Sequence, residues 1–249
     1  PGRFIQVKTN LKSDGTTTPE LYWISLFFKH KNHAPLMMLD TPEGGEKWSA
    51  VKEVSWKSYL ANPETLAFSI YISGDNGKTW NPVRENINAD LQKKTPAASD
   101  QEKSVRMKFK VLTTKYKDGR YILKIKGFDR TDANNPVLTS EIVSKPFILA
   151  NKAPEVSIIS CNELEDGRAV VTGFVKTQSV NIGEVLYRIN DADWAQAFPQ
   201  DGVFDNDREK FVIYLNKPYP AKFTLLLKVT DEAGNIVTKD YKLSVRKEK

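Results

Sequence analysis

The chain has 249 residues, of which 40% are hydrophobic and 27% are charged, and its net charge is +6. This composition is typical of a folded globular protein and excludes an intrinsically disordered one. No apolar run approaches the ~20 residues that a membrane-spanning helix needs. The length is sufficient for two domains of ordinary size.

The chain begins Pro1-Gly2-Arg3, without a methionine or the apolar core of a signal peptide. We therefore expect it to be a mature or excised part of a longer protein. The single cysteine, Cys161, excludes an intrachain disulfide. It does not exclude secretion, because a domain of this size can be held by its hydrophobic core alone.

Residues 1–33 contain two candidate β-strands, 4–11 and 21–29, on either side of the turn-rich sequence KSDGTTTP. We expect a β-hairpin here, followed by a linker at His30–Pro35. Both faces of the second strand carry large apolar side chains, and one hairpin cannot bury them alone. It must pack on an upstream domain, on residues 34–150 or on another copy of the chain. We expect self-association through residues 1–33.

Residues 34–150 alternate between apolar and polar side chains in several short segments. The predicted strands are 51–59, 66–73, 78–83, 105–112, 121–128 and 142–149. Arg106, Lys108 and Lys110 alternate with apolar residues, which indicates the solvent-facing side of a sheet and argues against a nucleic-acid interface. Residues 84–104 are polar and aperiodic, so they are predicted to be a long, weakly packed loop.

Residues 151–249 repeat this layout after the sequence Asn151-Lys-Ala-Pro154, which resembles Asn32-His-Ala-Pro35 and is interpreted as a second linker. The predicted strands are 156–161, 169–177, 184–190, 193–198, 210–216, 223–230 and 236–245. Short strands at close, regular spacing are typical of an antiparallel β-sandwich, and no stretch has a convincing helical period.

Two segments with the same pattern, 121–129 and 223–231, are the clearest sign of duplication. Their matched positions are Leu123 with Leu225, Ile125 with Leu227, and Asp129 with Asp231. A period of two places the four apolar residues on the buried face of a strand. We predict that these residues are buried and that the two segments superpose.

The sequence LAFSIYISGDNGKTW at residues 66–80 resembles a strand pair of bacterial fibronectin type III and immunoglobulin-like repeats. FTLLLKVTDEAGN at 223–235 is similar to the end of these repeats, and DGVFDN at 201–206 also recurs in them. Residues 3–35 resemble the closing strands of a jelly-roll-like domain. The first unit departs from the pattern in its loop at 84–104 and in residues 128–135, which lack the Ala-Gly-Asn turn.

This resemblance implies an all-β fold of two tandem antiparallel β-sandwiches, at residues 34–150 and 151–249. Residues 1–33 would be a hairpin that ends an upstream β domain. Such modules occur at the C-terminal end of large secreted bacterial β-propeller proteins. The resemblance therefore implies an extracytoplasmic protein, which is secreted, periplasmic or attached to the cell surface.

Catalytic and metal-binding residue combinations are not evident. A nucleophile needs a nearby base, but His30 and His33 both lie in a predicted linker. Zinc normally needs three or four protein ligands, which this pair alone does not supply. Cys161 ends an apolar strand and is interpreted as a buried, inert thiol. We expect no catalytic, cofactor-binding or metal-binding residues, and hence no enzyme.

Two acidic loops leave a calcium site open as an alternative. Their acidic residues are Asp129 and Asp132 in the loop at 129–135, and Asp201, Asp205, Asp207 and Glu209 in the loop at 201–209. Calcium takes 6–8 oxygen ligands, but neither loop has the spacing of an EF-hand. Asp and Asn are also the usual turn formers, and this is the interpretation that we favour.

Trp80 and Trp194 occupy equivalent positions in the two units. They are either core residues or platforms for sugar stacking, and core packing is the favoured interpretation. Trp56 is predicted to be a core residue.

The predicted function is that of a non-catalytic spacer, docking or adhesion module of a larger bacterial protein. The alternatives are a glycan-binding accessory module of a carbohydrate-active enzyme and the sensor ectodomain of a receptor. The expected partners are neighbouring domains of the same chain, another protein or a glycan, but not nucleic acid.

Overall fold

The computed structural model describes residues 6–17, 19–26, 34–59, 66–89, 104–129 and 137–247. It separates into two units, Pro1–Asn32 and His33–Lys249, which are considered individually. The described residues are almost entirely β-strand and irregular structure, with a 3₁₀ turn at Thr113–Lys115 and no α-helix. The predicted all-β class is therefore confirmed.

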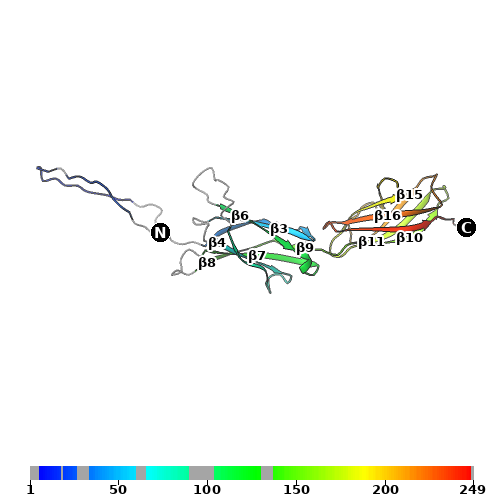
Figure 1. The fold of residues 1–249 in the computed structure, drawn as a ribbon, viewed down its shortest axis with the longest axis horizontal. Coiled ribbons are helices and arrows are strands. Elements are labelled where there is room, and N and C mark those ends of the chain that lie inside the picture. Colours follow the sequence, from blue (N-terminus) through cyan, green and yellow to red (C-terminus); the bar gives the residue numbers. More distant parts are fainter. Residues whose placement is uncertain are drawn as a thin grey trace. The chain divides into compact units, whose positions relative to one another are not determined.

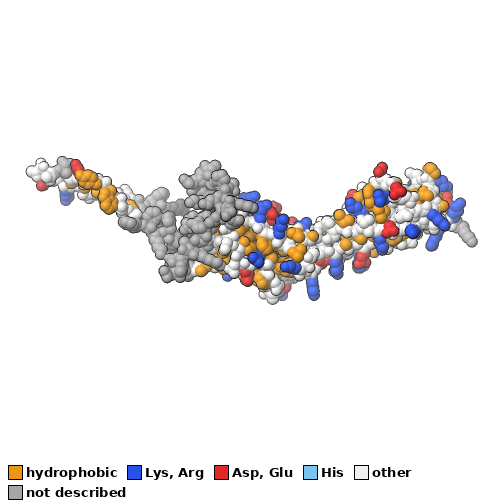
Figure 2. Space-filling view, viewed as in Figure 1, with side chains coloured by type: hydrophobic (Ala, Val, Ile, Leu, Met, Phe, Trp, Pro, Cys, Tyr) orange, Lys and Arg blue, Asp and Glu red, His pale blue; other side chains and the backbone are white. Residues whose placement is uncertain are grey.

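In the first unit, described residues 6–11 and 21–26 form no β-strand, so the predicted strands are not found there. The turn between them is present. The Asp14 carboxylate accepts hydrogen bonds from the backbone N–H groups of Thr16 and Thr17, at 2.9 and 3.0 Å. The apolar side chains remain in solvent, with Tyr22 83% and Trp23 76% exposed (Figure 2). A two-stranded hairpin by itself is at most marginally stable in water.

The described residues between 36 and 149 form two sheets that enclose a hydrophobic core, here called the first sandwich (Figure 1). One sheet has the order β1-β3-β6, and the other has the order β2-β9-β7-β4-β5, with β8 also paired to β7. Trp56, Phe68 and Ile125 are fully buried between the sheets. The strands are β1 (Leu36–Thr41), β2 (Lys47–Trp48), β3 (Val51–Tyr59), β4 (Leu66–Ser73), β5 (Asn81–Asn88), β6 (Ser104–Leu112), β7 (Gly119–Asp129), β8 (Leu138–Val143) and β9 (Phe147–Leu149).

Two predicted boundaries in the first sandwich are wrong. The strand expected at 78–83 is β5, which begins at Asn81 and runs to Asn88 into the predicted loop; residues 90–103 of that loop lie outside the described residues. The strand expected at 142–149 is divided into β8 and β9. Between them Ser144 pairs with β7, because Leu123 N–H donates to Ser144 Oγ at 2.9 Å and Ser144 N–H donates to Leu123 O at 2.8 Å.

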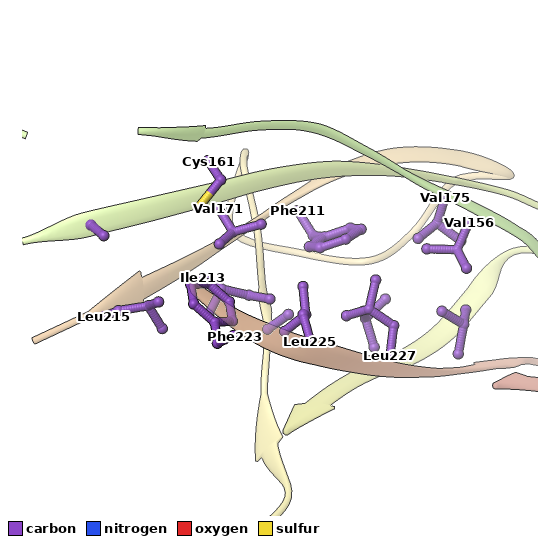
Figure 3. Close-up of a cluster of buried hydrophobic side chains, with 14 of the residues drawn as sticks. Val156, Cys161, Val171, Val175, Phe211, Ile213, Leu215, Phe223, Leu225 and Leu227 are labelled. Carbon is purple, nitrogen blue, oxygen red and sulfur yellow. The ribbon is translucent and has the colours of Figure 1, made fainter. Parts of the chain in front are cut away.

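Residues 155–247 form a second pair of sheets, the second sandwich, with the orders β14-β15-β11-β10-β18 and β13-β12-β16-β17. Its core contains Val171, Phe211 and Leu225 between the two sheets (Figure 3). The strands are β10 (Glu155–Glu163), β11 (Ala169–Lys176), β12 (Ile182–Ile189), β13 (Ala195–Gln196), β14 (Phe198–Pro199), β15 (Arg208–Leu215), β16 (Lys222–Asp231), β17 (Ile236–Ser244) and β18 (Arg246–Lys247).

The strand predicted at 193–198 is also divided. β13 pairs with β12, whereas β14 pairs with β15 in the opposite sheet. The chain changes sheets at Ala197, which is fully buried and whose N–H donates to Val185 O at 2.9 Å. A small residue is needed there because the crossing point lies inside the core.

The duplicated segments, 121–129 and 223–231, occupy β7 and β16 and show the same alternation of buried and half-buried residues. The predicted burial of the four matched apolar residues is confirmed. Their exposed fractions are 1% for Leu123 and 0% for Ile125, Leu225 and Leu227. The matched acidic residues Asp129 and Asp231 are also buried, at 1% and 3% exposure.

Candidate functional site

The segment that connects the two sandwiches is the candidate functional site. Asn151 N–H donates to Asp118 Oδ1 at 2.8 Å, and Lys152 N–H donates to Asp118 Oδ2 at 3.2 Å. The Asn151 side-chain oxygen accepts bonds from Thr113 Oγ1 at 2.6 Å and from Ala50 N–H at 3.1 Å. Residues 151–154 form no strand and connect β9 to β10, and polar groups of Asn151 and Lys152 are bonded to the first sandwich rather than left to water.

In the second sandwich, the turn that follows β16 contacts the connecting segment. Asp231 Oδ1 accepts bonds from the N–H groups of Ala233 and Asn235, at 3.0 and 2.8 Å, and Gly234 has a φ of +86°. The Asn235 side-chain amide donates to Asp231 Oδ2 at 2.8 Å and to the carbonyl of Ala150 at 2.7 Å. The turn thus holds its own shape and also binds the connecting backbone.

A second hydrogen bond joins the sandwiches directly. Ser49 Oγ donates to the carbonyl oxygen of Ala233 at 2.7 Å, and this bond is buried. Beside it Ala150, Ala233 and Val180 form a small apolar cluster with exposed fractions of 0%, 4% and 4%, against which Ile148 packs. Loss of this bond would be costly, because it would leave a buried polar group without a partner and without water to replace it.

An ion pair lies at the rim of this joint. Lys47 Nζ is 2.5 Å from Glu232 Oε2, which also accepts a bond from Asn181 N–H at 2.9 Å. Burial opposes ionisation of Glu232, but the hydrogen bonds from Lys47 and Asn181 outweigh it and hold the pKa of the carboxyl below its usual value. We use the term interdomain joint for the contacts made by Lys47, Ser49, Ala150, Asn151, Glu232, Ala233 and Asn235.

The other candidate residues that the structure describes do not contribute to these contacts. Cys161 is buried, and burial raises the pKa of its thiol, as expected for an inert cysteine. Glu209 is buried and accepts bonds from both the backbone and the side-chain nitrogen of Asn206, at 3.1 and 3.0 Å. In the described ranges, no three His, Cys, Asp or Glu residues lie close enough to hold a metal ion. His30, His33 and Asp132 lie outside the described residues.

The remaining acidic residues of the loop at 201–209 fit the role of turn formers. Asp201 Oδ1 accepts a bond from Val203 N–H at 3.4 Å, and Asp205 Oδ1 accepts one from the Asn206 side chain at 2.6 Å. The Asp207 carbonyl accepts a bond from Thr177 N–H at 2.8 Å, which ties this loop to the end of β11.

The prediction that Trp80 and Trp194 are core residues is wrong. Trp80 is half-buried outside the core, with Lys124 Nζ 4.6 Å from its ring centroid and Gly77 against the ring. Trp194 is 41% exposed and lies beside the Arg188 guanidinium, 5.3 Å from the ring centroid. Each indole follows a turn and packs on a cation of the outer sheet face. Trp56 is fully buried, as predicted.

Sequence reasoning missed Ser49, Thr113 and Asp118, because they lie next to strands and follow no periodic pattern. The only available signals were the Asn-x-Ala-Pro sequence at 151–154 and the Asp-x-Ala-Gly-Asn turn at 231–235. These signals indicated a boundary and a turn, but not that the two would be bonded to each other.

Comparison with models of known protein families finds no match to this chain, and comparison with curated protein sequences finds none either. Over the ranges that the structure describes, no helix has the length and hydropathy needed to cross a membrane.

Proposed function

We propose that this chain is a non-catalytic structural module that holds neighbouring parts of a larger bacterial extracytoplasmic protein at a fixed spacing. The observation that carries the proposal is the interdomain joint, in which backbone groups of residues 150–152 are bonded to both sandwiches. Domains in one chain normally move relative to each other unless their interface is well packed. A fixed connection is what a spacer requires.

The strength of the joint can be judged from its individual contacts. The buried bond from Ser49 and the partly buried bond from Asn235 each contribute about 0.5–1.5 kcal/mol, and the half-exposed Lys47–Glu232 pair adds no more than about 1 kcal/mol. Together with the apolar cluster they favour the closed joint by a few kcal/mol. The open form is then a small fraction of the population.

The extracytoplasmic and bacterial part of the proposal is supported by sequence resemblance. The segments at 66–80 and 223–235 resemble bacterial fibronectin type III and immunoglobulin-like repeats. Two sandwiches with duplicated strands β7 and β16 are compatible with such repeats. Their motifs consist of core and turn residues, so the resemblance bears on fold more than on activity.

Distance measurement between spin labels tests the spacer. In a Cys161→Ala background, single cysteines replace Lys110 on β6 and Thr238 on β17, both of which are exposed. We expect one narrow distance distribution, which broadens in the Ser49→Ala/Asn235→Ala variant. A broad distribution in the chain with an intact joint would contradict the proposal.

A control variant separates the joint from general damage. Asn216→Ala removes an exposed Asn of the second sandwich outside the joint, and it should leave the distance distribution unchanged. Broadening by Asn216→Ala to the same degree would show that the effect does not come from the joint.

The second candidate function is glycan binding, and the exposed ring of Trp194 favours it. Trp80 is a poor platform because Lys124 and Gly77 both lie against its ring. Glycan-array binding that is lost on Trp194→Ala but kept on Trp80→Ala would support this candidate. Array binding that is unaffected by Trp194→Ala would exclude Trp194 as the contact.

A further inference from the structure

The outer face of the sheet β10-β11-β15 carries a concentration of positive charge. Val171, Val175, Phe211 and Ile213 point into the core of the second sandwich (Figure 3). The alternate residues of β11 and β15 therefore face outward, and residues directly opposite in the register share this face. The outward pairs are Lys176 with Arg208, Phe174 with Lys210, Thr172 with Val212, and Val170 with Tyr214.

Two of these residues form an arrangement that disfavours folding. Lys176 and Arg208 lie directly opposite each other, and like charges in such positions destabilise a sheet. Lys210 adds a third cation two residues along β15. On the other side of Lys176, Glu155 of β10 is the directly opposite residue and offsets part of the charge. The excess remains positive, which favours an anion on this surface.

A hollow of about 390 Å³ lies beside Lys176. Phe174 and Lys176 line it from β11, Glu155 and Ser157 from β10, and Val237 and Lys239 from β17, with Pro154 and Val156 completing it. The Lys239 ammonium donates to the carbonyl of Val156 at 3.4 Å, which holds it at the edge of the hollow. The hollow thus combines an aromatic ring with two lysines from different strands and one carboxylate, that of Glu155.

We propose that this face, here called the Phe174 face, binds an acidic polysaccharide. One sugar ring lies in the hollow against Phe174. Its carboxylate or sulfate groups pair with Lys176 and Lys239, and those of the adjoining sugars pair with Arg208 and Lys210. Neighbouring strands are ~4.8 Å apart and alternate residues along a strand ~6.8 Å apart, so the cations are spaced on the scale of single sugar units.

The surface fits a polysaccharide better than an acidic peptide. An added peptide strand would use a free sheet edge, where backbone groups give most of the affinity. Phe174 and Lys176 belong to β11, whose backbone groups are paired with β10 on one side and with β15 on the other. The outer edge of β10 is paired with β18 only at Asn162 and Glu163, but two strands would separate a peptide on that edge from Arg208 and Lys210. Sugar rings instead offer flat apolar faces for an aromatic ring and charged groups for lysine and arginine. The proposal is independent of the interdomain joint, so either can fail without the other.

The test is affinity electrophoresis and calorimetry of the full chain with polygalacturonate. Highly methyl-esterified polygalacturonate is the matched neutral ligand, because it has the same backbone with its carboxylates masked. Dextran sulfate with plain dextran is the corresponding pair for sulfate. We expect binding to one or both acidic polymers and at least tenfold weaker binding to their neutral partners. Added salt should weaken the acidic complexes.

The variants locate the site. Arg208→Glu/Lys210→Glu should weaken binding roughly tenfold or more, since each bond to a charged group is worth about a factor of ten. Phe174→Ala should weaken it severalfold without changing the charge. Lys222→Glu/Lys242→Glu, at exposed positions of β16 and β17, lowers the net charge by the same amount as the double variant and should retain most of the affinity. Circular dichroism melting verifies that each variant is folded.

Three results would overturn the proposal. The first is no binding of the unaltered chain to either acidic polymer. The second is a loss of affinity with Lys222→Glu/Lys242→Glu that equals the loss with Arg208→Glu/Lys210→Glu, which would indicate unspecific charge attraction. The third is tighter binding to a single-stranded oligonucleotide than to the polysaccharides, with the same variants impaired, which would assign the face to nucleic acid.

Discussion

Replacing Asn235 by alanine tests whether the interdomain joint contributes to stability. The variant loses the side-chain bonds to Asp231 Oδ2 at 2.8 Å and to Ala150 O at 2.7 Å. A bond to a charged group is worth about 1.5–3 kcal/mol and a neutral one about 0.5–1.5 kcal/mol, and water replaces part of both at this half-buried position. We therefore expect a loss of about 1–3 kcal/mol in the free energy of unfolding.

Urea unfolding followed by tryptophan fluorescence measures this loss. The urea concentration at the midpoint should fall. The slope of the free energy of unfolding against urea concentration should stay the same, because the surface exposed on unfolding hardly changes. If the two sandwiches unfold in separate steps, Trp194 reports on the second and Trp48, Trp56 and Trp80 on the first. An unchanged midpoint for Asn235→Ala would refute the reasoning. So would an equal fall for Asn216→Ala, the exposed control.

Three further predictions concern other parts of the chain. Leu225→Ala should lower the free energy of unfolding by about 2–5 kcal/mol because Leu225 is fully buried, whereas exposed Ile236→Ala should have little effect; equal denaturation midpoints would contradict this. The folded-state pKa of Glu232 is lowered. Its contribution to the free energy of unfolding is therefore present above the unfolded pKa of about 4.5 and is lost as the pH falls through the folded pKa. The stability difference between the unaltered chain and Glu232→Gln, measured by urea unfolding, should thus be larger at pH 7 than at pH 3, and a constant difference would argue against the ion pair. Finally, a chain that starts at Pro35 should stay folded and self-associate less than the full chain, because Tyr22 and Trp23 are exposed; sedimentation that finds the full chain monomeric and the shorter chain unfolded would show that the N-terminal residues belong to the fold.

Periodicity was a reliable guide in the long strands that have one buried face, but it did not reveal β1, whose Met37 and Leu39 pack against the core. The alternation in 105–111 and in the duplicated segments gave β6, β7 and β16 with the correct inward residues. It failed where the chain changes partners over a few residues, as at Ser144 between β8 and β9 and at Ala197 between β13 and β14. Such interruptions depend on which strand lies alongside, and a local pattern does not contain that information.

Tryptophan illustrates a second limit. Trp56, Trp80 and Trp194 are chemically identical, yet only Trp56 lies in the core. Burial of Trp56 follows from its alternation with Val54 along β3. Trp80 and Trp194 follow turns, so their positions depend on the cations Lys124 and Arg188 that neighbouring strands present. The equivalent positions of Trp80 and Trp194 in the two units therefore led to the wrong prediction that both are core residues.

The sequence by itself determined the all-β class, the inward-facing residues of the main strands and the turn at Asp231–Asn235, because these depend on interactions between residues close in the chain. Only the tertiary structure decided that Asn151 and Asn235 form a joint and that Lys176, Arg208 and Phe174 share one face. Both arrangements bring together residues from strands and turns far apart in sequence. Their proximity is fixed by sheet register and packing, which no local pattern specifies.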